Sequence, residues 1–525
     1  MTRTSMTNPL MIDAAASPGG GLIGVTICPG KKITERFNTS WERDLDTDMA
    51  VVQAWRPQAV VTLMEQHELE RFQVAPLGQQ VRDRGIAWHH LPIRDVDVPG
   101  AAFEAAWSYS GLRLRAILAG GGRVLVHCRG GLGRTGTIAA RLLIELGTAP
   151  EAAIRAVRAA RPSTIETAAQ EACVRDVRPI SPAADAWAGR VLGCLLGGAV
   201  GDGFGYAVEF DRLAAIHRRH GPQGLRAPVF EAGRLVVSDD TQMTLFTLEG
   251  MLRAVGAGGA WQEDAVVAQV RRACLDWLDT QSGGLAGKTL VGALAHRPAL
   301  RVRRAPGTTC LAALQQGGHG SLAAPANDSK GCGAAMRSAP LGLLAGIAPA
   351  AAARLGARTG ALTHGHADGW GAAAVVAAAI CRAAQGATLA AALAGAITDL
   401  DPLGPAPTRL PYRRALDLAE RQPDAPAAAI ATLGEGWVGE EAVAIAAYAA
   451  LTGTDFAEVM ALAANHDGDS DSTAAIAGQL WGACHGIGGM PHEWIERLDV
   501  RDEVFALARA LIALPHPAGA APGVS

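Results

Sequence analysis

The sequence predicts two domains of different fold class, an α/β domain followed by an all-α domain. Residues 21–178 alternate short β-branched runs with helical stretches, which is typical of a largely parallel sheet flanked by helices. Residues 188–514 carry long Ala- and Leu-rich helical patterns with few strand signals. Residues 179–187 contain two prolines and no clear periodicity, so we expect a linker there.

Both ends of the chain are expected to lie outside these domains. Residues 1–20 are polar and Gly-rich, which predicts a flexible N-terminal tail, and residues 515–525 are expected to be a disordered C-terminal tail. Within the first domain, residues 59–64 and 123–126 are interpreted as buried strands. Helical patterns flank these strands and cover two stretches, 46–55 and 101–118.

Composition limits the function classes. The chain of 525 residues has a net charge of -3 and no Lys/Arg run, so we expect no nucleic-acid partner. Its most apolar run, 372–380, is short and leads into Arg382, which favours a buried helix over a membrane span. The nine cysteines form no CxxC pair, which argues against a disulfide framework or a thiolate zinc site. The start of the sequence has no secretory-signal pattern, so we expect a cytoplasmic protein.

One motif carries phosphate-ester chemistry. The run VLVHCRGGLGRTG at 124–136 places five residues between Cys128 and Arg134, and it lies between an expected strand and an expected helix from about 133 to 146. Backbone N–H groups and the helix N-terminus can cradle a phosphate there, and the same field favours the thiolate of Cys128. Arg134 can grip two phosphoryl oxygens. We expect the cradle to comprise Arg129, Gly130, Gly131, Leu132, Gly133 and Thr135, with the glycines supplying unusual backbone angles and Thr135 bonding the departing sulfur.

The alternative for this motif is a buried cysteine in an ordinary strand–helix turn. The full His-Cys-x5-Arg-Thr-Gly pattern is far more specific than a lone Gly-rich turn, and it favours the phosphate loop. A cysteinyl-phosphate reaction also needs an acid for the leaving oxygen. Asp95, in HHLPIRDVDVPG, is the best candidate, with Asp97 as the alternative.

Three acidic segments stand out in the second domain. They contain Glu209, the run 238–241 (SDDT) and the run 467–473 (DGDSDST). Adjacent carboxylates and hydroxyls without His or Cys partners suit hard cations, Mg²⁺ or Mn²⁺, and so many carboxylates would need two ions to offset their repulsion. The alternative for 238–241 is helix capping. A calcium loop at 467–473 is disfavoured because the acidic residue at its twelfth position is missing.

Residues 21–178 resemble the protein tyrosine/dual-specificity phosphatase superfamily, and in particular the cyclin-dependent-kinase-associated phosphatase branch. The resemblance lies in HHLPIRD, VHCRGGLGRTG and RPSTIETAAQ. It implies that Cys128 is the nucleophile, Arg134 binds phosphate and Asp95 is the acid, without any cofactor. It also implies that Gln170 positions the hydrolytic water. Phosphotyrosine, phosphoserine or phosphothreonine, and a small phosphorylated metabolite all remain open as substrates.

Most of residues 188–490 resemble the ADP-ribosylglycohydrolase family, which includes the dinitrogenase reductase-activating glycohydrolase. Besides the acidic runs, the resemblance rests on RAPGTTCLAAL, NDSKGCGAAMRSAPLG and LTHGHAD. It implies a two-metal site with ligands Ser238, Asp239, Asp240, Asp469, Asp471 and Ser472. It implies a diphosphate-binding loop of Ser329, Lys330, Gly331, Cys332 and Gly333. His364 would contact the ribose or a phosphate, or else be an ordinary helix-end histidine.

The chemistry that the resemblance implies is hydrolysis at C1″ of the distal ribose. Two Mg²⁺ ions would hold the 2″- and 3″-hydroxyls and orient a water. Glu209 matches an acidic residue near the scissile bond, and either Asp240 or Glu209 would act as base or electrostatic partner of the transition state.

The leading hypothesis is therefore a bifunctional hydrolase, acting on ADP-ribosylated or phosphorylated protein or on a related small molecule. One alternative is that one domain is a non-catalytic binding module. Another is that the helical domain hydrolyses a different N-glycoside or a nucleotide.

Overall fold

The computed structural model describes residues 2–34, 40–256, 259–281, 291–404, 406–422 and 425–515. The chain divides into two compact units, Met1–Asp185 and Ala186–Ser525, the first with a sheet and helices and the second helical. The predicted fold class is confirmed. The division lies inside helix α8 (Pro182–Tyr206), which starts within the stretch expected to be a linker. All but Pro515 of the expected C-terminal tail lies outside the described residues.

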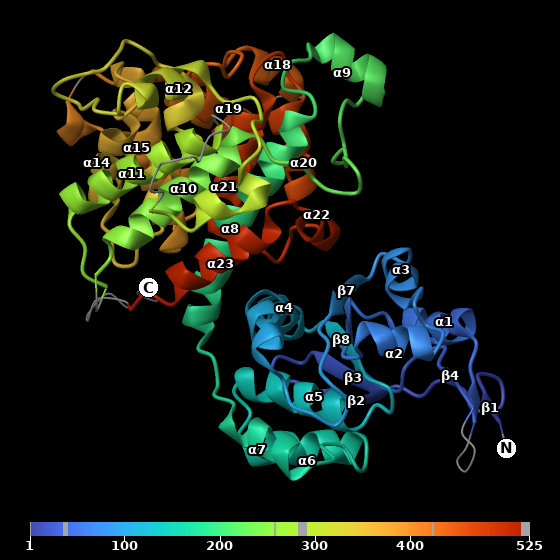
Figure 1. Ribbon diagram of the computed structural model, residues 1–525. Helices are drawn as coiled ribbons and strands as arrows, with labels where there is room; N and C mark the ends of the chain where they lie inside the picture. The colour runs from blue at the N-terminus through green and yellow to red at the C-terminus, as the bar shows by residue number, and fades with distance from the viewer. Residues whose placement is uncertain are drawn as a thin grey trace. The chain divides into compact units, whose positions relative to one another are not determined.

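The first domain is built on a five-stranded sheet (Figure 1). Its strands, in spatial order, are β2 (Asp13–Ala16), β3 (Leu22–Thr26), β8 (Arg123–His127), β6 (Ala59–Thr62) and β7 (Ala87–His90). All neighbours are parallel except β2, which runs antiparallel to β3. A smaller sheet joins β1 (Arg3–Thr4), β5 (Trp41–Glu42) and β4 (Lys32–Ile33).

The prediction of a flexible tail at 1–20 is therefore wrong for the residues of β1 and β2. Strand β2 has the sequence DAAA, without the β-branched or aromatic residues that mark strands in a sequence. Main-chain bonding to the open edge of β3 holds it, in the register Asp13↔Val25 to Ala16↔Leu22. An ion pair between Asp13 and Arg161 at 2.7 Å adds to this attachment.

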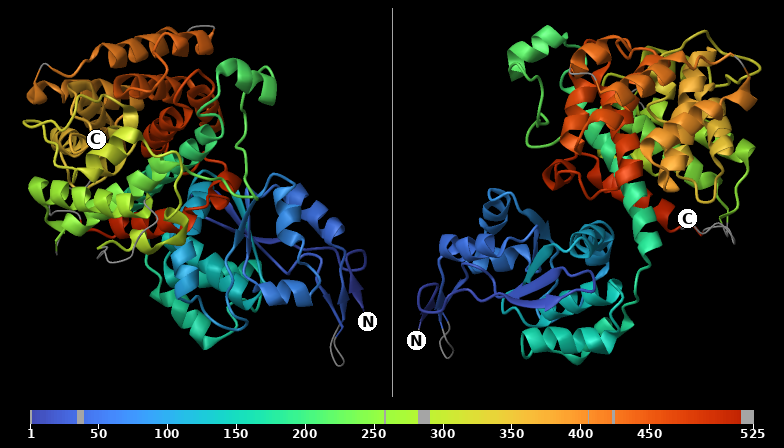
Figure 2. Two further views of the ribbon diagram at one scale, coloured as in Figure 1. Left: turned by 45° about the horizontal axis from the view of Figure 1, so that its top comes forward. Right: turned by 180° about the vertical axis from the view of Figure 1, so that it is seen from behind.

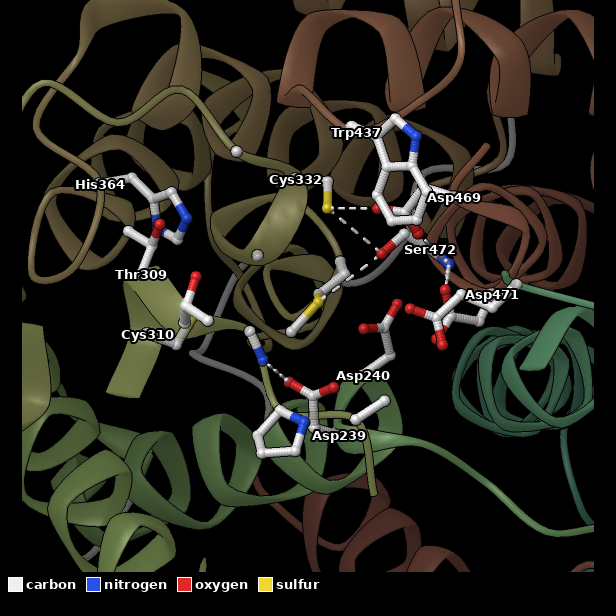
Figure 3. Close-up of a pocket in the computed structure, with 18 of the residues that line it drawn as sticks. Asp239, Asp240, Thr309, Cys310, Cys332, His364, Trp437, Asp469, Asp471 and Ser472 are labelled. Atoms are coloured by element: carbon white, nitrogen blue, oxygen red, sulfur yellow. Dashed lines mark hydrogen bonds between the residues drawn. The ribbon is translucent and has the colours of Figure 1, made fainter. Parts of the chain in front are cut away.

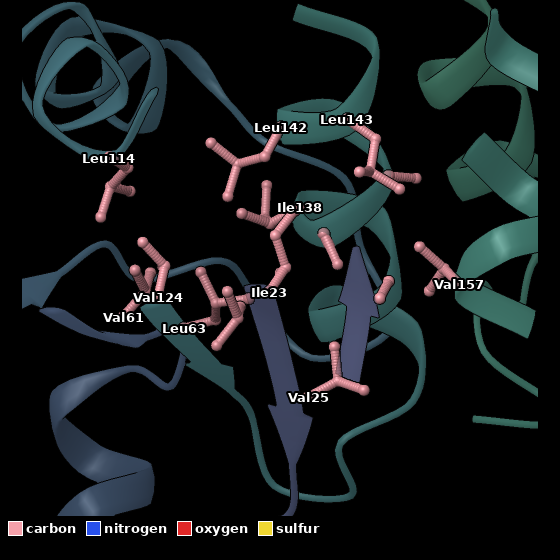
Figure 4. Packing of buried hydrophobic residues seen from close by; sticks show 14 of the residues in the cluster. Ile23, Val25, Val61, Leu63, Leu114, Val124, Ile138, Leu142, Leu143 and Val157 are labelled. Atoms are coloured by element: carbon pink, nitrogen blue, oxygen red, sulfur yellow. The ribbon is translucent and has the colours of Figure 1, made fainter. Parts of the chain in front are cut away.

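Helices cover both faces of the large sheet. Because side chains alternate along a strand, Val124 and Val126 of β8 face one apolar cluster and Leu125 faces the other. The first cluster is completed by helices α4 (Ala101–Ala119), α5 (Gly133–Glu145), α6 (Pro150–Ala160) and α7 (Ala168–Asp176). Figure 4 shows Ile138 and Leu142 of α5 packed over the strands in this cluster. The second is completed by α1 (Leu45–Trp55), α2 (Gln66–Arg71) and α3 (Leu77–Arg82).

The second domain packs its helices around α15 (Ala367–Ala384). By length and composition α15 could cross a membrane, but 83% of that stretch is buried inside the domain, as in the core helix predicted for 372–380. Its neighbours include α14 (Pro349–Gly360), α19 (Gly439–Thr452) and α21 (Ser470–His485), and α10 (Asp239–Ala254) packs against α21. The short helix α9 (Leu213–His220) projects from the edge of this domain in every view (Figures 1 and 2).

Helices α8 and α21 touch through their main chains. Glycines recur every four residues on α8, at Gly193, Gly197, Gly201 and Gly205. A Cβ on any of them would lie only 2.1–2.4 Å from a carbonyl oxygen of α21. The two helices can approach this closely only because those positions have no side chain, and the contact brings the start of α21 beside the end of α8.

Candidate active sites

The phosphate loop of the first domain lies between β8 and α5, as predicted. Cys128 follows the last residue of the central strand, and Gly131 donates its N–H to the Cys128 sulfur at 3.3 Å. Of the three loop glycines, Gly131 alone has a left-handed φ, +69°, and a Cβ there would lie 2.4 Å from the Thr26 carbonyl oxygen. Leu132 caps α5, and the Gly130 carbonyl accepts a bond from Arg161 at 3.3 Å.

Arg134, the second residue of α5, is almost completely buried and held rigidly. Its guanidinium donates to both carboxylate oxygens of Glu68 at 2.6 and 2.9 Å and to the Ile93 carbonyl at 2.9 Å. Burial would raise the pKa of Glu68, but the bonds from Arg134 and from the Glu65 N–H outweigh it, so the pKa lies below its ordinary value. Glu68 is therefore an anion that fixes the orientation of Arg134.

The structure brings Asp95 to the phosphate loop. Its carboxylate lies 2.9 Å from the Arg134 guanidinium and 3.5 Å from that of Arg129. The rival, Asp97, accepts the N–H of Val98 through its side chain. These contacts favour Asp95 as the group that faces a bound phosphate ester.

Gln170 is fully buried beside the same loop. Its side-chain N–H donates to the Asp97 carbonyl at 3.3 Å, and its oxygen accepts the N–H of Glu166 at 3.0 Å. The Glu166 carboxylate in turn accepts the N–H of Gly133 at 2.7 Å, so one amide of the expected cradle is already used. Thr135 is buried, and its hydroxyl has no hydrogen-bond partner among the described residues.

The second domain contains a cavity of about 740 Å³ (Figure 3). Its wall includes Asp239 and Asp240 from the start of α10, and Asp469, Asp471 and Ser472 from the start of α21. Glu209 completes the acidic wall. Segments more than 200 residues apart in the sequence thus line one cavity.

Helix capping and site formation coexist at these helix starts. Ser238 caps α10 by accepting the N–H of Asp240 at 3.2 Å and is not among the residues that line the cavity. Asp202, fully buried on α8, accepts the N–H groups of Ser238 and Thr241 at 2.8 and 2.9 Å. Burial raises the pKa of Asp202 to about 6, although these bonds oppose the shift. Asp469 similarly caps α21 by accepting the N–H of Ser472 at 3.2 Å.

The carboxylates of the cavity repel one another. Burial, together with the neighbouring carboxylates of Asp469, Asp239 and Asp202, raises the pKa of Glu209 to about 8. Burial and neighbouring carboxylates also raise the pKa values of Asp239, Asp240 and Asp471 well above their ordinary range. This is the electrostatic state expected of a cation site without its cation.

Two buried carboxylate oxygens, Oδ2 of Asp240 and Oε2 of Glu209, have no hydrogen-bond partner among the described residues. Hard oxygen donors with free lone pairs fit Mg²⁺ or Mn²⁺. Among the described residues no three His, Cys, Asp or Glu side chains already form one coordination cluster. The carboxylates therefore place oxygen donors around the cavity, but they do not yet surround a single cation position.

The predicted diphosphate loop lies directly beside the acidic residues from the start of α21. Gly331, Cys332 and Gly333 line the cavity, whereas Ser329 bonds Thr309 at 3.1 Å and Lys330 pairs with Glu440 at 2.5 Å. His364 packs against this loop, since a Cβ on Gly333 would lie 3.1 Å from its ring. Burial, with a smaller effect of Arg337, lowers the pKa of His364 to about 3, so it is a neutral wall residue.

Two exposed aromatic side chains frame the mouth of the cavity. Phe210 is 74% exposed and Trp437 is 42% exposed, and their rings stack with centroids 6.4 Å apart. An ion pair between Arg212 and Glu435 at 2.9 Å joins the two segments that carry them. Figure 3 places Trp437 above Asp469, at the acidic end.

Sequence reasoning missed Glu68, Glu166 and the aromatic pair. A glutamate three residues into the α2 region gives no local sign that it will hold an arginine 66 residues away. Phe210 directly follows Glu209, and this exposed aromatic beside a candidate acid was the one available signal.

Fold and sites together define a two-site hydrolase. Residues 183–520 match the family model for ADP-ribosylglycohydrolase, which covers more than half of the chain. The chain therefore belongs to the ADP-ribosylglycohydrolase family. Residues 47–181 match the model described as Swiss Army Knife protein, DSP-PTPase phosphatase domain, so the N-terminal domain is a dual-specificity-type phosphatase domain. Both domains are of hydrolase families.

Two curated relatives match separate parts of the chain. ADP-ribosylarginine hydrolase Tri1 of Pseudomonas putida is 42% identical over 66 residues, which are 13% of this chain and 18% of the relative. Cyclin-dependent kinase inhibitor 3 of Rattus norvegicus is 30% identical over 145 residues, which are 27% of this chain and 64% of the relative. The chain thus spans less than two thirds of the length of either relative.

Solved structures show similarity to each domain. One of an ADP-ribosylglycohydrolase-related protein complex is 26% identical, with a TM-score of 0.43, and covers 63% of this chain and 99% of its own. One of kinase associated phosphatase, carrying a serine at its catalytic cysteine, is 26% identical, with a TM-score of 0.29, and covers 32% of this chain and 94% of its own.

Proposed function

We propose that this protein is a bifunctional hydrolase of the reducing cytoplasm, and that its helical domain releases ADP-ribose from a protein side chain. The observation that carries this proposal is the cavity in which the acidic starts of α10 and α21 meet, with two buried carboxylate oxygens lacking partners. The relative that hydrolyses ADP-ribosylarginine supports arginine as the acceptor. All nine cysteines are free thiols, which is consistent with a reducing compartment.

Asp239, Asp240, Asp469, Asp471 and Ser472 would hold two Mg²⁺ ions, with Ser238 buttressing the start of α10. When bound, the ions supply positive charge that binds the ribose hydroxyls and orients a water. Glu209 would move the proton, because its buried Oε2 has no hydrogen-bond partner among the described residues and can accept or give a proton there. The loop of Gly331, Cys332 and Gly333, backed by the neutral His364, would form the wall against which the diphosphate lies, and the N–H groups of Gly331 and Cys332 already donate to the Ser329 hydroxyl and the Trp437 carbonyl at 3.3 Å.

In the phosphatase domain, the Cys128 sulfur would attack phosphorus while the phosphorus–oxygen bond to the leaving group breaks. Asp95 would give its proton to the leaving oxygen, and Arg134 would bind two phosphoryl oxygens. In the second step a water, positioned by Gln170, would attack phosphorus. The sulfur–phosphorus bond breaks, and Asp95 takes up the proton of the water.

The glycohydrolase is tested by Mg²⁺-dependent release of ADP-ribose from arginine-, serine- and DNA-linked substrates. We expect release from the arginine linkage, loss of release in Asp239→Ala/Asp240→Ala, and unchanged release in Cys128→Ser. No release from any linkage by folded, Mg²⁺-binding protein would refute this function and favour another riboside or a binding role.

The phosphatase is tested with an aryl phosphate and with phosphotyrosine and phosphothreonine peptides. We expect Cys128→Ser to abolish hydrolysis and Asp95→Asn to slow the release of poor leaving groups by roughly 10²- to 10⁴-fold. Hydrolysis that survives in Cys128→Ser would contradict the cysteinyl-phosphate route. Phosphopeptide binding without any hydrolysis by the parent protein would support a binding module instead.

A further inference from the structure

The acidic cavity contains sulfur as well as oxygen. The Cys332 thiol donates to the Asp469 carboxylate at 2.7 Å, and the Ser472 hydroxyl lies 3.5 Å from the same sulfur. The Met336 thioether lies 3.9 Å from the Ser472 hydroxyl and also lines the cavity. The Cys332 thiol thus contacts two of the side chains assigned to the cations, Asp469 and Ser472 (Figure 3). The Met336 thioether contacts Ser472.

A second observation indicates that a cation belongs beside this sulfur. Asp240 is 3% exposed and lines the same cavity, and its Oδ2 has no hydrogen-bond partner among the described residues. Cys332 lines this cavity, and its sulfur faces Asp469 and Ser472 (Figure 3). An unpaired carboxylate oxygen and a thiol on one cavity wall are the mixed donor set that borderline and soft cations prefer.

We propose that Cys332 gives this centre a sulfur ligand, so that the cavity binds a thiophilic divalent cation such as Zn²⁺ more tightly than Mg²⁺. The inference rests on the cation site of the proposed function. On binding, the S–H bond of Cys332 breaks, a sulfur–cation bond forms, and the proton leaves to solvent. Zn²⁺ would displace Mg²⁺ from the sulfur side of the cavity and stop the release of ADP-ribose.

The chain offers a matched control. Cys310 also lines this cavity, but its sulfur accepts a hydrogen bond from the Arg337 guanidinium at 3.6 Å. A positive neighbour disfavours a cation, so Cys310 should bind none. Cys310→Ser therefore removes a thiol from the same cavity without removing the proposed ligand.

The test titrates the metal-free full chain with Cd²⁺ and follows the ultraviolet sulfur-to-cadmium charge-transfer band. Every variant carries Cys128→Ser so that the phosphatase thiol does not contribute. We expect a band that saturates in the parent and in Cys310→Ser and is absent in Cys332→Ser. Loss of an outer partner of a ligand costs about 10–100-fold in metal affinity, so Cys332→Ser should weaken Zn²⁺ binding at least that much. Mg²⁺ affinity should change much less.

The outcomes distinguish failure of the sulfur ligand from failure of the cation site of the proposed function. A band that persists in Cys332→Ser, or equal Zn²⁺ affinity in both proteins, would overturn the sulfur ligand while leaving the Mg²⁺ site standing. A parent protein that binds neither Mg²⁺ nor Cd²⁺ would overturn the cation site as well. An increase in melting temperature on adding Mg²⁺ shows that Cys332→Ser is folded, and Cys332→Ala provides a second variant with the same expected result.

Discussion

Both carboxylate oxygens of Glu68 accept hydrogen bonds from the Arg134 guanidinium, at 2.6 and 2.9 Å. The pair is buried, so each charge depends on the other. We expect Glu68→Gln to lower kcat/KM for an aryl phosphate by roughly 10- to 100-fold, since a hydrogen bond to a charged group contributes about 1.5–3 kcal/mol. Steady-state kinetics check this, with the exposed Glu70→Gln on the same helix as control. Unchanged kinetics would mean that Arg134 is oriented without Glu68.

Glu166 competes with phosphate for the amide of Gly133, because its carboxylate accepts that N–H at 2.7 Å. Replacing it with alanine removes a negative charge from the edge of the loop and frees one donor. We expect Glu166→Ala to tighten the binding of vanadate or phosphate several-fold, measured as the inhibition constant. Weaker binding would show that Glu166 instead supports the shape of the loop.

The pKa of Glu209 near 8 predicts how stability depends on pH in the absence of divalent cations. Between its ordinary value of 4.5 and about 8 the folded protein keeps a proton that the unfolded chain has lost. The contribution of Glu209 to the free energy of unfolding therefore falls as pH rises through this window. Denaturant unfolding at several pH values should show this fall, with a smaller slope in Glu209→Gln and no change of slope in the exposed Asp502→Asn.

Divalent cations should reverse this trend. Mg²⁺ favours the ionised carboxylates, so its stabilising effect should be larger at pH 8 than at pH 6. The measurement is the shift of the unfolding midpoint on adding Mg²⁺, at pH 6 and at pH 8. An equal shift at both pH values would contradict the assignment of the raised pKa to the cation site.

Because the main chains of α8 and α21 are in contact, we expect Gly→Ala at this contact to destabilise the protein, although it stabilises most helices. On an exposed helix Gly→Ala stabilises by about 1 kcal/mol. At Gly478 the added Cβ would lie 2.0 Å from the Gly197 carbonyl oxygen, so we expect Gly478→Ala to destabilise by about 1–3 kcal/mol. Thermal unfolding measures this. Gly488→Ala, whose Cβ would meet open space, is the control and should be nearly neutral.

Features written locally in the chain were predictable. The phosphate loop joins strand and helix as the motif requires, and α5 begins at Gly133 as expected. The acidic runs likewise open α10 and α21, because Asp and Ser at a helix start satisfy its free N–H groups whatever else they do.

Features that depend on distant partners were not predictable. The hydrogen bond from Arg134 to Glu68 forms only when two segments distant in the sequence meet, and the residues around Glu68 give no sign of it. Strand β2 is held by main-chain bonds to β3, to which its alanines contribute no pattern. The spacing of four between glycines on α8 was visible, but only the structure shows that it serves an approach to α21.

The close contact of α8 with α21 also divides the helical domain into parts that can change and parts that cannot. The position of the acidic start of α21 depends on the main-chain contact between α8 and α21, where even an added methyl group would clash. The stretch after Glu209, which carries the exposed Phe210 and α9, lies between α8 and α10, and we expect its exposed positions to tolerate replacement more readily. Substitutions on the exposed part of this segment would change which ADP-ribosylated side chains the cavity accepts. The carboxylates at the starts of α10 and α21 would keep their positions, because the glycine contact fixes α21 against α8.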